Sequence, residues 1–280
     1  MKKPLLSFLI MIIFLILLQD SLFAGSYRFK YNLKPGQKWL CTVSTMGENR
    51  MSGKKSIDRS KTKIQYRVFK GSKKGWVRLE AHIAFQGKNA GTLDMSKITY
   101  SAAFHQSGEI RGIKYSGSCM PDLGANAADI PEETLKMMEQ SYKMIPEAMK
   151  NMVFWFPEFP EIKLGIGDEF DFKQRMGTGT TGDPMQTQSA MKQTFVLEDV
   201  SKGLAYFTVK DRSVSKISTM GNKCKVKSAG KGDALFDMKQ GMWVEWTEKS
   251  LTKIGMGKSA GSKTRNNTLK NITKFEMELQ

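Results

Sequence analysis

Few residues in this chain have the types and spacing that catalysis requires. Its only two histidines, His82 and His105, stand on the polar side of stretches in which apolar and polar residues alternate. A Ser-His-Asp or Cys-His arrangement needs a nucleophile beside one of them, and nothing in the pattern brings one near. A metal site built on several histidines is excluded too, because the chain has no others. We therefore expect no enzymatic activity and no metal site.

A glycine-rich stretch, GTGTTG at 177–182, matches the dinucleotide-binding pattern GxGxxG. That pattern functions where a strand runs directly into a helix, whose N-terminus then holds the pyrophosphate. Here Asp183 and Pro184 follow, and no helical period of apolar residues comes after them. The stretch is expected to be a turn, and the sequence predicts no cofactor.

Acidic residues gather near the middle of the chain, and paired carboxylates can cleave glycosidic bonds. Spacing alone does not establish such a pair. Two of the acids alternate with Phe170, as the solvent side of a strand would. We therefore interpret the group as a solvated surface; its members are Glu158, Glu161, Asp168, Glu169 and Asp171.

Three cysteines, Cys41, Cys119 and Cys224, lie far apart in the sequence, which excludes the close CxxC spacing of zinc and redox sites. In an oxidising compartment two of them could form one disulfide and leave one thiol over. The sequence does not say which two. Cys41 and Cys224 alternate with apolar residues, so both are expected to face the interior.

Strands must position whatever site exists, because period-two alternation dominates the chain. Segments 61–70 and 76–85 are predicted to form one hairpin, and segments 192–200 and 204–210 a second. Lysines also alternate along one predicted strand face, where we expect them to protect a sheet edge from aggregation. These lysines are Lys223, Lys225 and Lys227.

Landmarks of the first half recur in the second half, in the same order and at a nearly constant offset. This pattern favours an internal duplication. The alternative is convergence, since strands and turns draw on few residue types. The matched landmarks are Gly36 with Gly167, Gly75 with Gly203, and Phe104 with Phe236.

Between the two halves the period changes to that of a helix. Asp129 and Pro131 mark its start, and Pro146 should kink it or begin a second helix. Apolar residues recur at steps of three and four along one stripe. We expect the stripe to pack on a sheet, and methionines in it could repack around an apolar ligand. Copper(I) binding by methionine is a weaker alternative. This candidate surface comprises Leu135, Met138, Tyr142, Ile145, Met149, Met152 and Trp155.

The first 24 residues have the composition of a secretory signal sequence: two lysines, an apolar run over 5–18, and a small residue, Ala24, before the expected cut. An uncleaved anchor is the alternative. A membrane span needs about 20 apolar residues, however, and Asp20 closes this run too early. We expect cleavage near Ala24 and a periplasmic or extracellular protein.

The formal net charge is +17. The charge is uneven, with a basic stretch at 54–75 and an acidic one at 129–169. A strongly basic protein is attracted to anionic surfaces. Because an exported protein rarely meets nucleic acid, we expect no nucleic-acid partner. An anionic membrane surface or a lipid-like ligand is the expected counterpart.

Together these patterns predict a mainly β (α+β) protein in which two duplicated antiparallel, curved β-sheet units are joined by a helical linker. The expected boundaries are 1–24 for the signal peptide, 25–116 for the first β copy, 117–160 for the methionine-rich acidic linker and 161–280 for the second β copy.

Three segments, 31–37 (YNLKPGQ), 159–168 (FPEIKLGIGD) and 236–241 (FDMKQG), together resemble an uncharacterised family of exported bacterial β-rich proteins. The resemblance spans most of the chain after the signal segment, although each motif is short. It implies bacterial export and a duplicated β fold. It supplies no catalytic residues.

Two hypotheses for function follow. The first is a non-enzymatic protein of the cell envelope that binds an apolar or amphiphilic, lipid-like ligand. The second is a structural or assembly protein that binds another envelope protein. Lipid that co-purifies with the chain would favour the first, and a stable protein complex without lipid would favour the second.

Overall fold

The computed structural model describes residues 25–51, 54–86, 95–121, 130–178, 185–219, 222–256 and 266–280. The predicted signal segment and the part of the glycine-rich stretch after Thr178 lie outside these ranges. Within them, no helix is both long enough and apolar enough to cross a bilayer.

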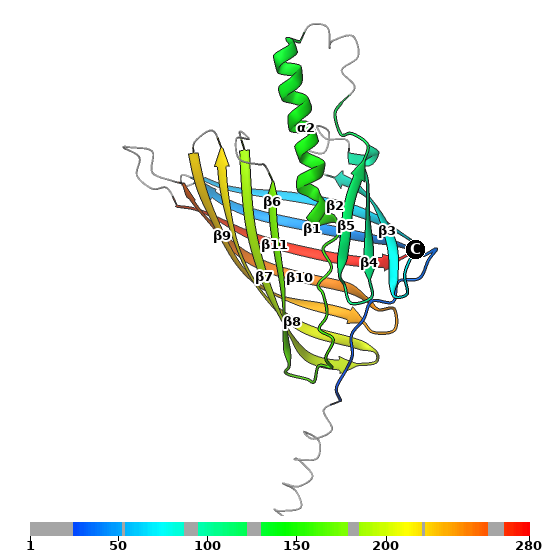
Figure 1. Cartoon of the computed structure of the whole chain (residues 1–280). Coiled ribbons are helices and arrows are strands. Elements are labelled where there is room, and N and C mark those ends of the chain that lie inside the picture. The colour runs from blue at the N-terminus through cyan, green and yellow to red at the C-terminus, as the bar shows by residue number, and fades with distance from the viewer. Residues whose placement is uncertain are drawn as a thin grey trace, which may run out of the picture.

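Eleven strands form one curved antiparallel sheet in the order β5-β4-β3-β2-β1-β11-β10-β9-β8-β7-β6 (Figure 1). The mainly β prediction is therefore confirmed. The two expected β-sheet units do not form separate sheets, because the last strand, β11, pairs with the first, β1. The strands are β1 Lys38–Met51, β2 Lys54–Lys70, β3 Trp76–Gln86, β4 Thr99–His105, β5 Ile110–Ser116, β6 Glu169–Thr178, β7 Met185–Ser201, β8 Leu204–Thr219, β9 Asn222–Asp237, β10 Met242–Met256 and β11 Asn266–Leu279.

Alternation gives the sheet two chemically different faces. In β9, Ala234 and Phe236 are buried on one side, which we call the inner face, whereas Lys225, Lys227 and Lys231 are exposed on the other, the outer face. The prediction that Lys223, Lys225 and Lys227 protect a sheet edge is wrong. β9 lies between β8 and β10, so its backbone groups are already paired on both sides.

The core on the inner face is aromatic. Its centre is Phe159, which belongs to a segment at 154–160 that we call the aromatic strap. The Phe159 ring lies 4.9 Å from that of Phe236 and 5.5 Å from that of Trp243, between ring centroids. Its backbone N–H donates to the carbonyl of Ser107 at 2.8 Å. The strap is thus held both by ring packing and by the β4–β5 turn.

Tyr31 connects the two halves of the sheet. Its ring lies 5.1 Å from that of Phe104 on β4 and 5.9 Å from that of Phe236 on β9. Its hydroxyl accepts a hydrogen bond from Trp243 Nε1 and donates one to the carbonyl of Pro157, both at 2.8 Å. Burial raises the pKa of Tyr31 well above its usual value, so the hydroxyl keeps the proton it donates.

The turns before β1 and β6 have the same hydrogen bonds. Gly36 N–H donates to Val68 O at 2.8 Å, and Gly167 N–H donates to Leu197 O at 2.7 Å. Both glycines have a positive φ, +91° and +88°, a conformation that side chains rarely tolerate. A second matched pair of bonds, each 2.7 Å long, runs from Lys34 N–H to Gln37 Oε1 and from Gly165 N–H to Asp168 Oδ2.

One helix, α2 (Glu132–Val153), lies between β5 and β6 in the chain and contains Pro146. Of the two alternatives expected at Pro146, a kink or the start of a second helix, the second is wrong, because α2 runs through the proline as one helix. Proline has no N–H, so the carbonyl of Tyr142, four residues earlier, lacks its helical donor. The thiol of Cys119 donates to that carbonyl instead, at 3.4 Å.

Tyrosine hydroxyls fix the helix to the first half of the sheet. Each donates to a carbonyl in the second half of α2; Val153 ends the helix, where carbonyls have no helical partner. The helix also contacts both edge strands, β5 and β6, and so bridges the two ends of the curved sheet (Figure 1). The bonds are Tyr115 to Lys143 O at 3.4 Å, Tyr100 to Pro146 O at 3.2 Å, and Tyr66 to Val153 O.

All three cysteines are free thiols. Cys41 and Cys119 are buried, and Cys224 is half-buried. Burial raises the pKa of the Cys41 thiol, which disfavours the reactive thiolate. The structure therefore contains none of the disulfides that the composition would permit.

Candidate functional site

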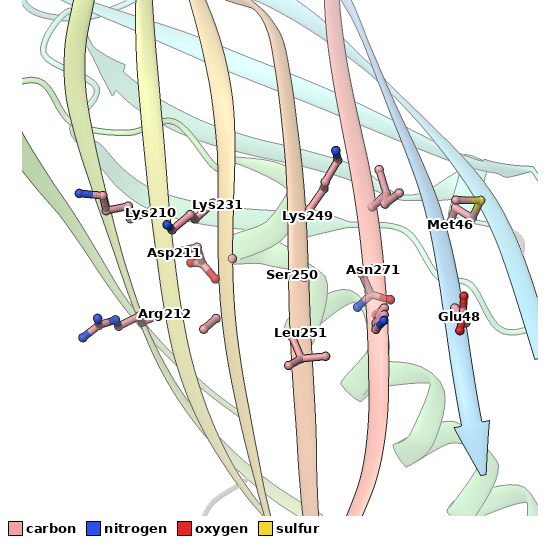
Figure 2. Close-up of a pocket in the computed structure, with 14 residues that line it drawn as sticks. Met46, Glu48, Lys210, Asp211, Arg212, Lys231, Lys249, Ser250, Leu251 and Asn271 are labelled. Carbon is pink, nitrogen blue, oxygen red and sulfur yellow. The ribbon is translucent and has the colours of Figure 1, made fainter. Parts of the chain in front are cut away.

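A basic hollow of about 760 Å³ lies on the outer face, across β8, β9, β10, β11 and β1. Two rows of side chains, each running across the five strands, flank the hollow, and the backbone of Gly230 and Ser250 lies between the rows. The first row consists of Lys210, Lys231, Lys249, Ile272 and Met46, and the second of Arg212, Ala229, Leu251, Lys270 and Glu48. Figure 2 shows Lys210, Lys231 and Lys249 on three successive strands. The hollow is also lined by Arg212, Lys270, Leu251, Ala229, Ile272, Met46, Glu48, Asp211 and Asn271.

Three lysines stand directly opposite one another in the first row. Lys210 pairs with Lys231, and Lys231 pairs with Lys249. Like charges directly opposite on neighbouring strands destabilise a sheet. None of the three forms an ion pair within the part of the chain that the structure describes. The row is therefore a concentrated positive charge that the fold itself does not neutralise.

Apolar side chains continue the two rows. Leu251, Ile272 and Met46 are 38%, 37% and 38% exposed, on β10, β11 and β1. Ile272 is directly opposite Lys249 on one side and Met46 on the other. Isolated apolar residues on a surface need no explanation, but here three of them adjoin uncompensated lysines. The hollow thus offers both cationic and apolar contacts to one ligand.

The acidic residues at the hollow do not pair with the three lysines of the first row. Glu48 forms an ion pair with Lys55 at 2.9 Å and stands directly opposite Lys270. Asp211 contributes its backbone to the hollow while its side chain points to the inner face, where it is 7% exposed. The hollow therefore has the charge and polarity to bind an anionic amphiphile, with the head group on the lysines and an acyl chain on the apolar side chains.

Asp211 and Glu248 are the acids on the inner face of β8 and β10. Burial raises the pKa of Asp211 to about 6. Burial also raises the pKa of Glu248 to about 7, and the negative charge of Asp211 adds to that shift. Both groups therefore titrate in a range where ordinary surface carboxyls are already ionised.

We expect the free energy of unfolding to fall as the pH rises. An acid whose pKa is raised by folding binds its proton more tightly in the native state, so stability is lost between the unfolded pKa, about 4, and the folded values near 7. Urea denaturation in EDTA at pH values across this window measures the loss. After allowance for partial solvent exposure, the loss amounts to about 2 kcal/mol.

Asp211→Asn should remove part of that pH dependence and leave the protein more stable than the wild type at basic pH. The matched control is Asp233→Asn, an exposed position on the outer face of β9. A parallel pH profile for wild type and Asp211→Asn would contradict the assignment.

The predicted helical stripe is only partly buried. Tyr142, Ile145, Met149 and Trp155 pack against the core, whereas Met152 is 60% exposed. Met152 does not lie on the buried side of the helix, because in the last helical turn its neighbour Val153 occupies that side and is completely buried. Leu135 and Met138 are half-buried nearer the helix start. The stripe is thus chiefly a packing surface, and it lies on the opposite side of the sheet from the basic hollow.

The acidic cluster lies at the surface, as expected, because all five of its members are exposed. Two of them also form structural contacts. Asp171 forms an ion pair with Lys192 at 2.9 Å and accepts a hydrogen bond from Thr194 at 2.8 Å. The bond from Lys192 is the main cause of the lowered pKa of Asp171. Asp168 caps the turn before β6. Among the described residues, no three His, Cys, Asp or Glu side chains gather as a metal site.

Sequence reasoning missed the basic hollow. Its residues come from five strands, and only the register places Lys210, Lys231 and Lys249 in one row. One signal was available: β8, β9, β10 and β11 all place lysine on the side opposite their buried residues. That alternation predicts a basic face but not which lysines become neighbours.

No protein-family model matches this chain, and no curated protein matches it either. The resemblance to an exported β-rich family therefore stays a prediction.

Some solved structures share part of the chain path. Lipovitellin, solved in a study of lipid-protein interactions, matches 89% of this chain over 26% of its own, with a TM-score of 0.42 and 9% identity. An outer membrane channel from Pseudomonas putida F1 matches 89% of this chain over 97% of its own, with a TM-score of 0.32 and 8% identity. The attachment invasion locus protein of Yersinia pestis has a TM-score of 0.22. These scores are too low to support an argument about this chain.

Proposed function

We propose that this protein is a non-enzymatic, exported protein of the cell envelope that binds anionic amphiphiles, and the anionic membrane surface they form, through the basic hollow. The observation that supports this most directly is the row Lys210, Lys231 and Lys249, in which like charges face one another without a partner. An anionic head group would relieve that repulsion. The exposed apolar side chains of Leu251 and Ile272 then contribute burial that a purely electrostatic site would lack.

The two-copy organisation is part of the same proposal. The matched hydrogen bonds at Gly36 and Gly167 support it. So do the bonds that follow: Gln106 N–H donates to Gly75 O at 3.0 Å, and Met238 N–H donates to Gly203 O at 2.9 Å. In this scheme the second half supplies most of the basic hollow, while the first half holds α2.

Vesicle co-sedimentation tests the function. We expect the wild-type chain to bind phosphatidylcholine vesicles that contain phosphatidylglycerol, and not vesicles of phosphatidylcholine alone. Each lysine near an anionic surface contributes about 1 kcal/mol. The double variant Lys231→Gln/Lys249→Gln should therefore weaken binding about 30-fold, since roughly 1.4 kcal/mol corresponds to a factor of ten.

The control carries the same charge change elsewhere. Lys73 and Lys74 are exposed lysines in the β2–β3 turn. The end of β2, at Lys70, lies roughly 35 Å along the strand from Arg59, which pairs with Met46 at the hollow. Lys73→Gln/Lys74→Gln should alter binding by less than about threefold, because surface charge away from the contact is screened by salt. Equal losses in the two double variants would indicate diffuse attraction and would contradict a defined site.

A further variant separates an amphiphile from a simple anion. Leu251→Ser should weaken binding to acyl-chain ligands while leaving the salt dependence unchanged, because it removes apolar area and no charge. If even the wild-type chain fails to bind anionic vesicles, the proposal fails and the assembly-protein hypothesis becomes the better one.

A further inference from the structure

Two neighbouring residues on the inner face, Gln193 and Asp211, each carry a buried acceptor oxygen. Gln193 on β7 is directly opposite Asp211 on β8. The two residues are only 3% and 7% exposed. Gln193 Oε1 and Asp211 Oδ1 have no hydrogen-bond partner among the described residues. Buried polar atoms are nearly always partnered in native proteins, so two adjacent ones call for a ligand or a proton.

A glycine brings a third acceptor to the same place. Asp211 is directly opposite Gly230 on β9, which has no side chain to fill the inner face. The side chain of Glu248 on β10 leans into that space. A Cβ atom on Gly230 would lie 2.5 Å from Glu248 Oε1. Paired Cα atoms are only about 5 Å apart, so a Glu248 carboxyl above Gly230 is turned toward the neighbouring strand of Asp211. The two carboxyls are close enough for the charge of Asp211 to raise the pKa of Glu248.

The surroundings do not neutralise these acids. The residues that share the cross-strand rows of Asp211 and Glu248 on the inner faces of β7 to β11 include no lysine or arginine. Two carboxyls held together without a cation repel each other at neutral pH. Those rows are Gln193, Asp211, Gly230, Ser250 and Asn271, and Phe195, Val209, Gly232, Glu248 and Thr273.

We propose that Gln193, Asp211 and Glu248 form a binding site for a divalent cation of the calcium class. All three side chains offer oxygen, which hard cations prefer, and calcium tolerates irregular geometry. Two carboxylates match the double positive charge. Ser250 supplies a further oxygen nearby, because its Cβ lies 3.1 Å from where a Cβ on Gly230 would stand. The site is on the opposite face from the basic hollow, so it does not depend on the proposed function.

Thermal unfolding of the metal-free full chain tests the site at basic pH, where both carboxyls are ionised. Calcium chloride is titrated at constant ionic strength, and terbium luminescence reports binding directly. At about a hundredfold excess over Kd, calcium should raise Tm by roughly 5 °C. No rise in Tm and no terbium signal would mean that the acids share only a proton, and the proposal would be overturned.

Three variants locate the effect. Asp211→Asn and Glu248→Gln should each abolish the calcium-dependent rise in Tm, and Glu248→Gln is the milder test because Glu248 is only half-buried. Glu245→Gln, on the outer face of the same strand, should respond as the wild type does. A calcium response that survives in both inner-face variants would place the cation elsewhere and refute the site.

Discussion

Replacing Phe159 with alanine is expected to lower the free energy of unfolding by about 4 kcal/mol. The side chain is 3% exposed and fills the centre of the aromatic core. Its removal leaves a cavity that the surrounding rings cannot close, because they are fixed by the sheet. The rings that would lose contact belong to Phe29, Tyr31, Phe170, Phe236 and Trp243.

Urea denaturation followed by tryptophan fluorescence measures this loss. The matched control is Phe172→Ala. Phe172 is only half-buried, and its ring lies 6.4 Å from that of Trp155. It should cost about 1 kcal/mol, in line with its smaller buried area. If the two variants were equally stable, the aromatic strap would not be the centre of the core.

Met149→Asp should lower the free energy of unfolding by about 3 kcal/mol, since it removes apolar burial and places a carboxyl against the core without a partner. Met149 lies on the side of α2 that packs against the core. The helix bridges both edges of the sheet, so loosening it should also expose those edges. Thermal unfolding measures the loss of stability. Mass spectrometry of co-purifying lipid measures whether the variant also loses a bound ligand.

Met152 provides the control on the same helix. It is 60% exposed, so Met152→Asp should change stability by less than about 0.5 kcal/mol. Unchanged stability in Met149→Asp as well would mean that the helix does not contribute to the fold. Loss of lipid from Met149→Asp without loss of stability would instead make the helical stripe a ligand surface.

Local structure was predictable because its causes are local. The hairpin of β2 and β3 follows from alternation and from the turn around Gly75, which has a φ of +79°. The helix between the halves follows from its apolar period. The partner of the carbonyl that Pro146 leaves without a donor does not follow from any local pattern, because it is the thiol of Cys119, 23 residues before Tyr142. Alternation and helical period predict the secondary structure of a segment, whereas contacts from other parts of the chain determine whether that structure accommodates a disfavoured residue such as Pro146.

The basic hollow and the inner acids were less accessible to prediction. Alternation places Lys231 outward and Gly230 inward, but the partners of each are set by the register with β8 and β10. A shift by two residues would keep every face assignment and separate the three lysines. In the sequence, Glu248 looks like an ordinary polar strand residue. Its carboxyl can lean over Gly230, toward the strand of Asp211, only because residue 230 has no side chain, and that depends on which strands are neighbours.

The position of β11 sets the order in which this sheet can be completed. Strand β11, Asn266–Leu279, lies between β1 and β10 in the middle of the sheet, and Gln280 N–H donates to Lys38 O at 2.9 Å. The two halves can form hairpins early, but they join only after β11 has been made, about 215 residues after the end of β1, which makes this a slow, non-local step. Until then β1 and β10 present open edges that can pair with other chains.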